Sequence, residues 1–139
     1  MNSRPPEAKA SVPVMRIAAI VEYDGGNYCG MQWQPNDPTI QSTIEKALRN
    51  FGVEDCVLRA SGRTDSGVHA RGQVLALWVP RRLAGKNLLS ALNWHVPEDI
   101  RFRKVAACAE DFDPRRDARM RTYRYWLVGG QAFPALERG

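Results

Sequence analysis

The order of helical and strand periodicities is the feature that most restricts the fold of this chain. Residues Met15 to Tyr23 form a short apolar run, rich in β-branched and small side chains, that ends at the turn Asp24-Gly25-Gly26. Such a run is typical of a buried strand. The next periodic segment begins at Thr39, places its apolar residues on one side of a helix and stops at Gly52. Residues 27–38 lie between the two and are predicted to form a loop.

The later segments extend this alternation. We predict further strands at residues 56–60, 73–79, 101–108 and 122–128, and a second helix at 83–94. The order β-α-β-β-α-β is that of a split βαβ, ferredoxin-like or RRM-like sandwich, in which two helices cover one face of an antiparallel sheet. The fold class is therefore predicted to be α+β.

A length of 139 residues suits one compact domain with tails. Residues 1–13 contain three prolines and no apolar stretch long enough for a signal peptide, so we predict a disordered tail there. The longest apolar runs are far too short to span a membrane. We expect a soluble, cytoplasmic protein with no membrane partner.

The three cysteines, Cys29, Cys56 and Cys108, stand far apart in the sequence. They form no C-x-x-C pair, and no clustered histidines accompany them. We therefore predict reduced thiols and no metal site.

The net charge of +5 is carried mainly by arginine, which supplies 16 of the 20 basic residues. Guanidinium groups bind phosphate through two parallel hydrogen bonds and stack on flat bases, whereas an ammonium group is a hydrated point charge. The same composition also suits an ordinary solvated surface. Charge therefore permits a nucleic-acid partner without requiring one.

The segment from Ser61 to Ala70 concentrates a carboxylate, a guanidinium group, hydroxyls and an imidazole between two predicted strands. Taken alone, Asp65-Ser66-Gly67 is a good turn sequence, because Asp can bond its own backbone and Gly tolerates positive φ. The local sequence therefore favours a turn residue at position 65.

A longer sequence pattern around Asp65 indicates a functional role instead of a turn. Residues 62–74, GRTDSGVHARGQV, resemble the signature G-R-T-D-x-G-V-H-x-x-G-Q-V of the tRNA pseudouridine synthase A (TruA) family. Further matches follow in the order of that family, and the resemblance covers about residues 15–128. They are Tyr23-Asp24-Gly25, Tyr28, Gly30, Gln32, Gln34, Thr39-Ile40-Gln41, Ala47-Leu48, Leu92-Asn93, Pro97 to Ile100, Phe112, Arg115 and Tyr123-Arg124-Tyr125.

The sequence departs from the family pattern at three positions. The family has an aromatic residue in place of Met31, Leu in place of Val96 and an aromatic residue in place of Arg116. The larger departure is length, because family members are about twice as long and build a second half that closes the active-site cleft. The resemblance therefore assigns residues 14–110 to an N-terminal synthase subdomain with the catalytic loop. Residues 111–139 are assigned to the start of a truncated second subdomain.

The resemblance implies three catalytic residues. Asp65 is the nucleophile, and attack on the base or on the sugar both remain open. Arg63 stacks in the space that the extruded uridine leaves and contacts phosphate, although it could instead pair with a nearby carboxylate and hold the loop. Tyr123 packs on the extruded base, although a strand tyrosine is often plain core. The reaction requires no cofactor.

The resemblance also implies the RNA contacts. Arg115 and Arg121 belong to a basic segment interleaved with tyrosines, which suits a surface that grips the backbone and stacks bases. The full set of substrate-binding residues is Tyr123, Arg63, Arg115, Arg121, His69, Gln73 and Tyr23. For His69, a structural role in the loop is the alternative.

The implied substrate is uridine at positions 38 to 40 of the tRNA anticodon stem-loop, and the implied assembly is a homodimer. A noncatalytic RNA-binding fragment that lacks the second half of the cleft is the alternative function.

Overall fold

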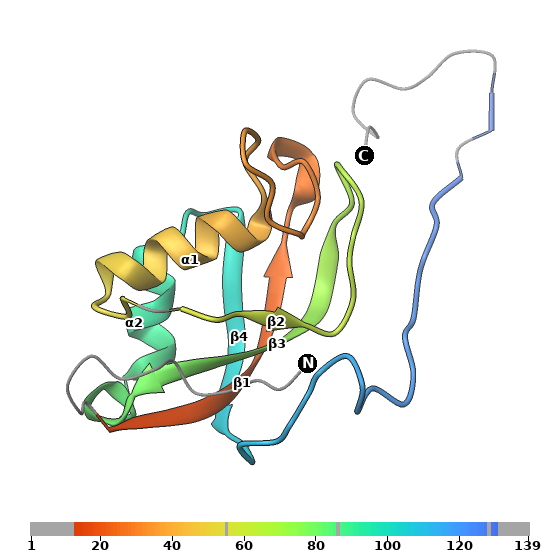
Figure 1. Cartoon of the computed structure of the whole chain (residues 1–139). Coiled ribbons are helices and arrows are strands. Elements are labelled where there is room, and N and C mark those ends of the chain that lie inside the picture. The colour runs from red at the N-terminus through yellow and green to blue at the C-terminus, as the bar shows by residue number, and fades with distance from the viewer. Residues whose placement is uncertain (1–12, 55, 86, 128, 131–139) are drawn as a thin grey trace.

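A computed structural model of the chain describes residues 13–54, 56–85, 87–127 and 129–130. Four antiparallel strands form one sheet in the order β2-β3-β1-β4, and two α-helices accompany it (Figure 1). The elements are β1 (Val14–Tyr23), a 3₁₀ helix (Gly25–Asn27), α1 (Ile40–Asn50), β2 (Arg59–Ala60), β3 (Ala70–Pro80), a 3₁₀ helix (Arg81–Leu83), α2 (Leu88–His95) and β4 (Ile100–Ala107). The predicted α+β class is confirmed.

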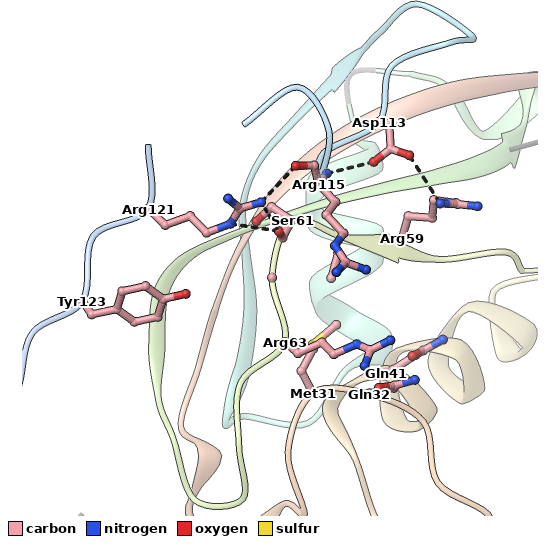
Figure 2. Close-up of a pocket in the computed structure, with 12 residues that line it drawn as sticks. Met31, Gln32, Gln41, Arg59, Ser61, Arg63, Asp113, Arg115, Arg121 and Tyr123 are labelled. Atoms are coloured by element: carbon pink, nitrogen blue, oxygen red, sulfur yellow. Dashed lines mark hydrogen bonds and ion pairs between the residues drawn. The ribbon is translucent and has the colours of Figure 1, made fainter. Parts of the chain in front are cut away.

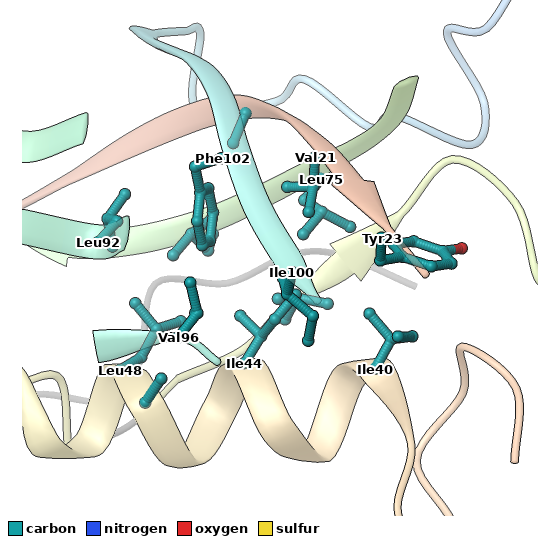
Figure 3. Close-up of a cluster of buried hydrophobic side chains, with 14 of the residues drawn as sticks. Val21, Tyr23, Ile40, Ile44, Leu48, Leu75, Leu92, Val96, Ile100 and Phe102 are labelled. Carbon is teal, nitrogen blue, oxygen red and sulfur yellow. The ribbon is translucent and has the colours of Figure 1, made fainter. Parts of the chain in front are cut away.

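The hydrophobic core lies between the helices and one face of the sheet. Alternation along β1 turns Ile17, Ala19, Val21 and Tyr23 toward the helices, and all four are almost fully buried. The apolar side of α1 meets them, as Figure 3 shows for three of its residues, Ile40, Ile44 and Leu48. Burial of each such side chain contributes roughly 1.5–3 kcal/mol to the stability of the fold. The packing of α1 on the sheet therefore holds the C-terminal end of β1, at Tyr23, in place.

Helix α1 begins and ends where the sequence predicts. The side chain of Thr39 accepts a hydrogen bond from the backbone N–H of Ser42 (3.1 Å), and the Ser42 hydroxyl accepts one from the Thr39 backbone (3.1 Å). This capping box satisfies two N–H groups that the first turn leaves unpaired. Gly52, with φ of +89°, follows the last turn.

The opposite face of the sheet carries a buried cation. Arg16 in β1 is 2% exposed, and its guanidinium carbon lies 5.4 Å from the ring centroid of Trp78 in β3. Its Nε and Nη2 donate to the carbonyl oxygen of Phe112 (3.1 and 2.9 Å). Arg16 thereby fastens the chain that follows β4 to this face of the sheet.

Three predicted elements differ in extent from the structure. The strand predicted at 56–60 is paired only at Arg59–Ala60, opposite Ala76 and Leu75. The second helix begins at Leu88, because residues 81–83 form a separate 3₁₀ helix and Gly85 follows. Strand β3 begins at Ala70, before the predicted Gln73.

The strand predicted at 122–128 is wrong for residues 122–127, and Val128 lies outside the described residues. The alternating pattern is present, but no neighbouring strand pairs with this segment in the described part of the chain. A strand needs a partner for its N–H and C=O groups, and residues 121–127 are exposed instead. Residues 1–12 of the predicted tail also lie outside the described residues.

No helix within the described residues is both long enough and apolar enough to cross a membrane. The three cysteines are unbridged and partly buried.

Candidate functional site

The loop between β2 and β3, residues 61–69, contains the predicted catalytic residue Asp65 and is braced from below by buried polar side chains. The Gln73 amide donates to the carbonyl of Gly62 (2.8 Å) and accepts from the Ser61 hydroxyl (2.7 Å). The hydroxyl of Tyr23, at the end of β1, lies 2.7 Å from the hydroxyl of Thr64. Tyr23 and Gln73, predicted as substrate contacts, therefore lie beneath the loop and hold it. Their direct contact with substrate stays a prediction.

The segment between β1 and α1 supports the same loop from the side. The backbone N–H of Met31 donates to the carbonyl of Thr64 (3.0 Å), and the carbonyl of Tyr28 accepts from Gly67 N–H (3.2 Å) and from the Ser66 hydroxyl (3.3 Å). Gly30 has φ of +87°, and a Cβ there would lie 2.8 Å from the carbonyl oxygen of Thr64. The two segments are packed backbone against backbone on both sides of Asp65.

Asp65 is exposed, and its carboxylate has no hydrogen-bond or ion-pair partner among the described residues. The turn that follows is closed by the backbone, since Val68 N–H donates to the Asp65 carbonyl (3.1 Å). The local turn therefore does not use the carboxylate. This differs from an Asp that shapes a turn through its own side chain.

His69 lies at the far end of the loop and contacts the turn after β1. Its Nδ1 accepts a hydrogen bond from the backbone N–H of Gly25 (3.0 Å) and is also 3.0 Å from Oδ1 of Asp24. A Cβ on Gly25 would clash with the carbonyl oxygen of Val68. These contacts agree with the structural role that sequence reasoning left open for His69.

An open pocket of about 470 Å³ lies beside the loop and is rich in arginine (Figure 2). The predicted residues Arg63, Arg115, Arg121 and Tyr123 all line it. The other lining residues are Met31, Gln32, Gln41, Arg59, Ala60, Ser61, Gly62 and Asp113. The structure thus brings together four of the predicted residues, while Asp65, His69, Gln73 and Tyr23 lie outside the pocket lining.

The far wall of the pocket is built by the segment after β4. Asp113 accepts hydrogen bonds from the backbone N–H groups of Arg115 (2.9 Å) and Arg116 (3.2 Å), and its Oδ2 lies 3.3 Å from Nη1 of Arg59. Desolvation acts to raise the pKa of Asp113, but the hydrogen bonds from Arg116 and Arg115 and the charge of Arg59 outweigh it and lower that pKa. Asp113 is therefore a charged anchor at neutral pH.

Arg121 closes the gap between this segment and the loop. Its Nε and Nη2 donate to the carbonyl of Ser61 (3.2 and 3.0 Å), and Nη2 also donates to the carbonyl of Arg115 (2.9 Å). Tyr123 follows at the rim and is 63% exposed, so it does not pack in the core. A hydroxyl and an open aromatic face are available there.

Sequence reasoning missed the three anchors Arg16, Arg59 and Asp113. Each acts on a residue distant in sequence, so local periodicity gives no sign of the pairing. One signal was present for Arg16, because a cation inside an apolar strand requires a buried partner.

The described residues include side chains of the types that could bind a metal ion. Within the described residues, no group of three or more His, Cys, Asp or Glu side chains is placed to hold an ion.

Comparison with known proteins relates this geometry to one family. A family model described as tRNA pseudouridine synthase matches residues 19–116, which include the whole loop and Arg115. Proteins named tRNA pseudouridine synthase A are similar to most of the chain. The protein from Rhodospirillum rubrum is 46% identical over 128 residues, which are 91% of this chain and 46% of that protein.

Two further relatives with the same name show a similar degree of identity. The protein of the same name from Thermotoga neapolitana is 42% identical over 113 residues (81% of this chain, 46% of the relative). The one from Borrelia hermsii is 40% identical over 116 residues (84% and 47%). The chain spans about half the length of the curated relatives it matches, and they align over roughly their N-terminal half. This chain belongs to the TruA family of tRNA pseudouridine synthases.

Proposed function

We propose that this chain is part of an enzyme that isomerises uridine to pseudouridine at positions 38 to 40 of the tRNA anticodon stem-loop, with Asp65 as the nucleophile. One observation carries the proposal: the Asp65 carboxylate is exposed, has no partner among the residues that the structure describes, and stands on a loop whose backbone is braced from two sides. A nucleophile needs a fixed position and an unoccupied reactive group, and this arrangement supplies both.

The chemistry fits a carboxylate acting without a cofactor. The bond between uracil N1 and ribose C1′ breaks, the base turns, and a new bond forms between C5 and C1′. A proton leaves C5 and one is gained at N1, so the composition does not change. A covalent intermediate with Asp65 divides this exchange into two easier steps.

The target base must leave its stack before it reaches Asp65. Tyr123 has an exposed ring on which a base can pack, and Arg63 lies two residues from Asp65 in the pocket lining. We propose these two residues as the partners of Asp65 in holding the extruded nucleotide and the strand that it leaves.

The proposal extends to the fold and assembly. The strand order and antiparallel pairing support a split βαβ, ferredoxin-like sandwich for residues 14–110. Residues 111–139 would begin a second subdomain, and the exposed segment 122–127, with which no strand in the described part of the chain pairs, supports that assignment. A homodimer is proposed from the family resemblance alone.

Tritium release tests the proposal. The 139-residue chain, free of host synthase, is incubated with a tRNA stem-loop labelled at C5 of uridine. We expect release by the unmodified chain and none by Asp65→Asn. Asp37→Asn changes an exposed loop aspartate and serves as the matched control that keeps release. Full release by Asp65→Asn would show that another group is the nucleophile.

A noncatalytic RNA-binding role is the second candidate, and the absence of Asp65 from the pocket lining favours it. In this case the arginine pocket binds RNA while the carboxylate performs no chemistry. An electrophoretic shift of the stem-loop that survives Asp65→Asn, together with no tritium release by the unmodified chain, would select this candidate.

A further inference from the structure

The arginine pocket has a large excess of positive charge. Four guanidinium groups, those of Arg59, Arg63, Arg115 and Arg121, line it against the single carboxylate of Asp113. That carboxylate already binds Arg59 and two backbone N–H groups. The pocket is therefore suited to an anion, and its volume of about 470 Å³ leaves room for one.

Two of the four arginines build the pocket walls. Arg121 spans from its own segment to the carbonyl of Ser61 through two donors (3.2 and 3.0 Å). Arg59 links β2 to Asp113 at 3.3 Å. Both guanidinium groups face protein acceptors and join the two sides of the pocket.

The other two arginines, Arg63 and Arg115, are placed differently. Both line the pocket, and Figure 2 shows their side chains reaching into the same open space from opposite walls. Across the described residues, neither guanidinium group has a hydrogen-bond or ion-pair partner within the protein. A guanidinium fork matches two phosphate oxygens, so this pair can hold one phosphate from two sides.

The position of the pocket relative to Asp65 suggests which phosphate. Arg63 lies two residues before Asp65, and two residues of extended chain span about 6–7 Å. Asp65 itself faces solvent outside the pocket. A nucleoside at Asp65 and a phosphate in the pocket can therefore belong to neighbouring positions of one strand.

We propose that the pocket is a phosphate subsite, in which Arg63 and Arg115 together bind the RNA phosphodiester next to the target uridine. Arg59 and Arg121 are positioning residues that shape the subsite. This inference rests on the proposed function for the identity of the neighbouring nucleotide, and on the pocket alone for its anionic ligand.

Fluorescence anisotropy with a labelled stem-loop RNA that carries one target uridine tests the subsite. We expect Arg63→Gln and Arg115→Gln each to weaken binding by roughly tenfold at moderate salt, since each removes a charge-assisted pair. The loss of affinity in the double variant should be smaller than the product of the two single-variant losses, because both arginines share one phosphate. Arg49→Gln, which removes the same charge near the end of α1, controls for net charge and should bind almost as tightly as the unmodified chain.

A neutral phosphate identifies the bound position. Two RNAs are compared, one with a methylphosphonate on the 5′ side of the target uridine and one with it on the 3′ side. We expect one of the two substitutions to weaken binding and to abolish the difference in affinity between the unmodified chain and Arg115→Gln. The subsite is overturned if the chain does not bind the RNA, if both arginine variants bind like Arg49→Gln, or if neither methylphosphonate erases the difference. Circular dichroism confirms that each variant is folded.

The two proposals fail in different ways. If Asp65→Asn abolishes tritium release while Arg63→Gln and Arg115→Gln bind normally, the subsite is wrong and the catalytic assignment stands. If the arginine variants behave as expected while Asp65→Asn keeps full release, the catalytic assignment is wrong and the subsite stands.

Discussion

The hydroxyl of Tyr23 lies 2.7 Å from the hydroxyl of Thr64, which ties the buried end of β1 to the residue before Asp65. The same Tyr23 hydroxyl is 3.4 Å from Nε2 of Gln73, which also holds the carbonyl of Gly62. The loop 61–69 is therefore fastened to the core through a small polar network next to Asp65, the proposed nucleophile.

Replacing Tyr23 by Phe should loosen this loop without unfolding the sheet. The hydroxyl deletion removes the hydrogen bonds of Tyr23 with Thr64 and with Gln73, so we expect a loss of about 1–2 kcal/mol in the free energy of unfolding. Amide hydrogen exchange should accelerate within residues 61–69. Tyr125→Phe removes a hydroxyl from an exposed ring and should change neither measurement. Equal exchange in both variants would mean that the network does not brace the loop.

Replacing Gly30 by Ala should displace the loop from the other side. Gly30 has φ of +87°, and a Cβ there would lie 2.8 Å from the carbonyl oxygen of Thr64. The left-handed conformation alone costs an alanine about 1–2 kcal/mol, and the contact adds to it. Urea unfolding should show the loss. Gly72→Ala is the matched control and should be neutral or slightly stabilising, because among the described residues, chain neighbours aside, nothing lies within 4 Å of the added Cβ.

Asp113→Asn should weaken the pocket wall in a manner that depends on pH. The pKa of Asp113 is lowered in the folded chain, so its charge stabilises the fold above the ordinary carboxyl pKa, and this contribution is lost as pH falls through the folded pKa. We expect a stability gap of about 1 kcal/mol between the unmodified chain and the variant at pH 7, narrowing below pH 3.8.

Urea titrations of both proteins across this pH range measure the gap. Asp37→Asn, in an exposed loop, should show no gap at either end. A gap for Asp113→Asn that is independent of pH would show that its charge does not contribute.

Leu127→Ser should leave stability almost unchanged despite the loss of a large apolar side chain. Leu127 is 94% exposed, so its removal sacrifices little burial, and we expect a change within about 0.5 kcal/mol. Because exposed large apolar side chains such as Trp126 and Leu127 favour association, the variant should also self-associate less in analytical ultracentrifugation. Trp78→Ser, which removes a buried side chain on the face of β3 opposite the helices, should by contrast cost several kcal/mol.

Most of the local elements, and the loop that stands out chemically, could be predicted from residues close together in the chain. The periodicity of residues 40–51 and the cap at Thr39 predict α1, because helix ends and apolar stripes depend on neighbours a few residues away. The run of residues 62–74 likewise carries the family signature in one continuous stretch, so Asp65 could be singled out without a structure.

The residues that support that loop and those that line the pocket could be identified only after folding brought distant segments together. Tyr23 meets Thr64, Arg59 meets Asp113, and Arg16 meets the carbonyl of Phe112. These partners are 41, 54 and 96 residues apart, respectively, and no local pattern encodes such pairs. The segment 122–127 shows the same limit, since its alternation is that of a strand but pairing requires a neighbour that the described chain does not place beside it. A helix forms through hydrogen bonds and side-chain contacts between residues a few positions apart. A paired strand, an ion pair or a pocket forms only when segments distant in sequence meet.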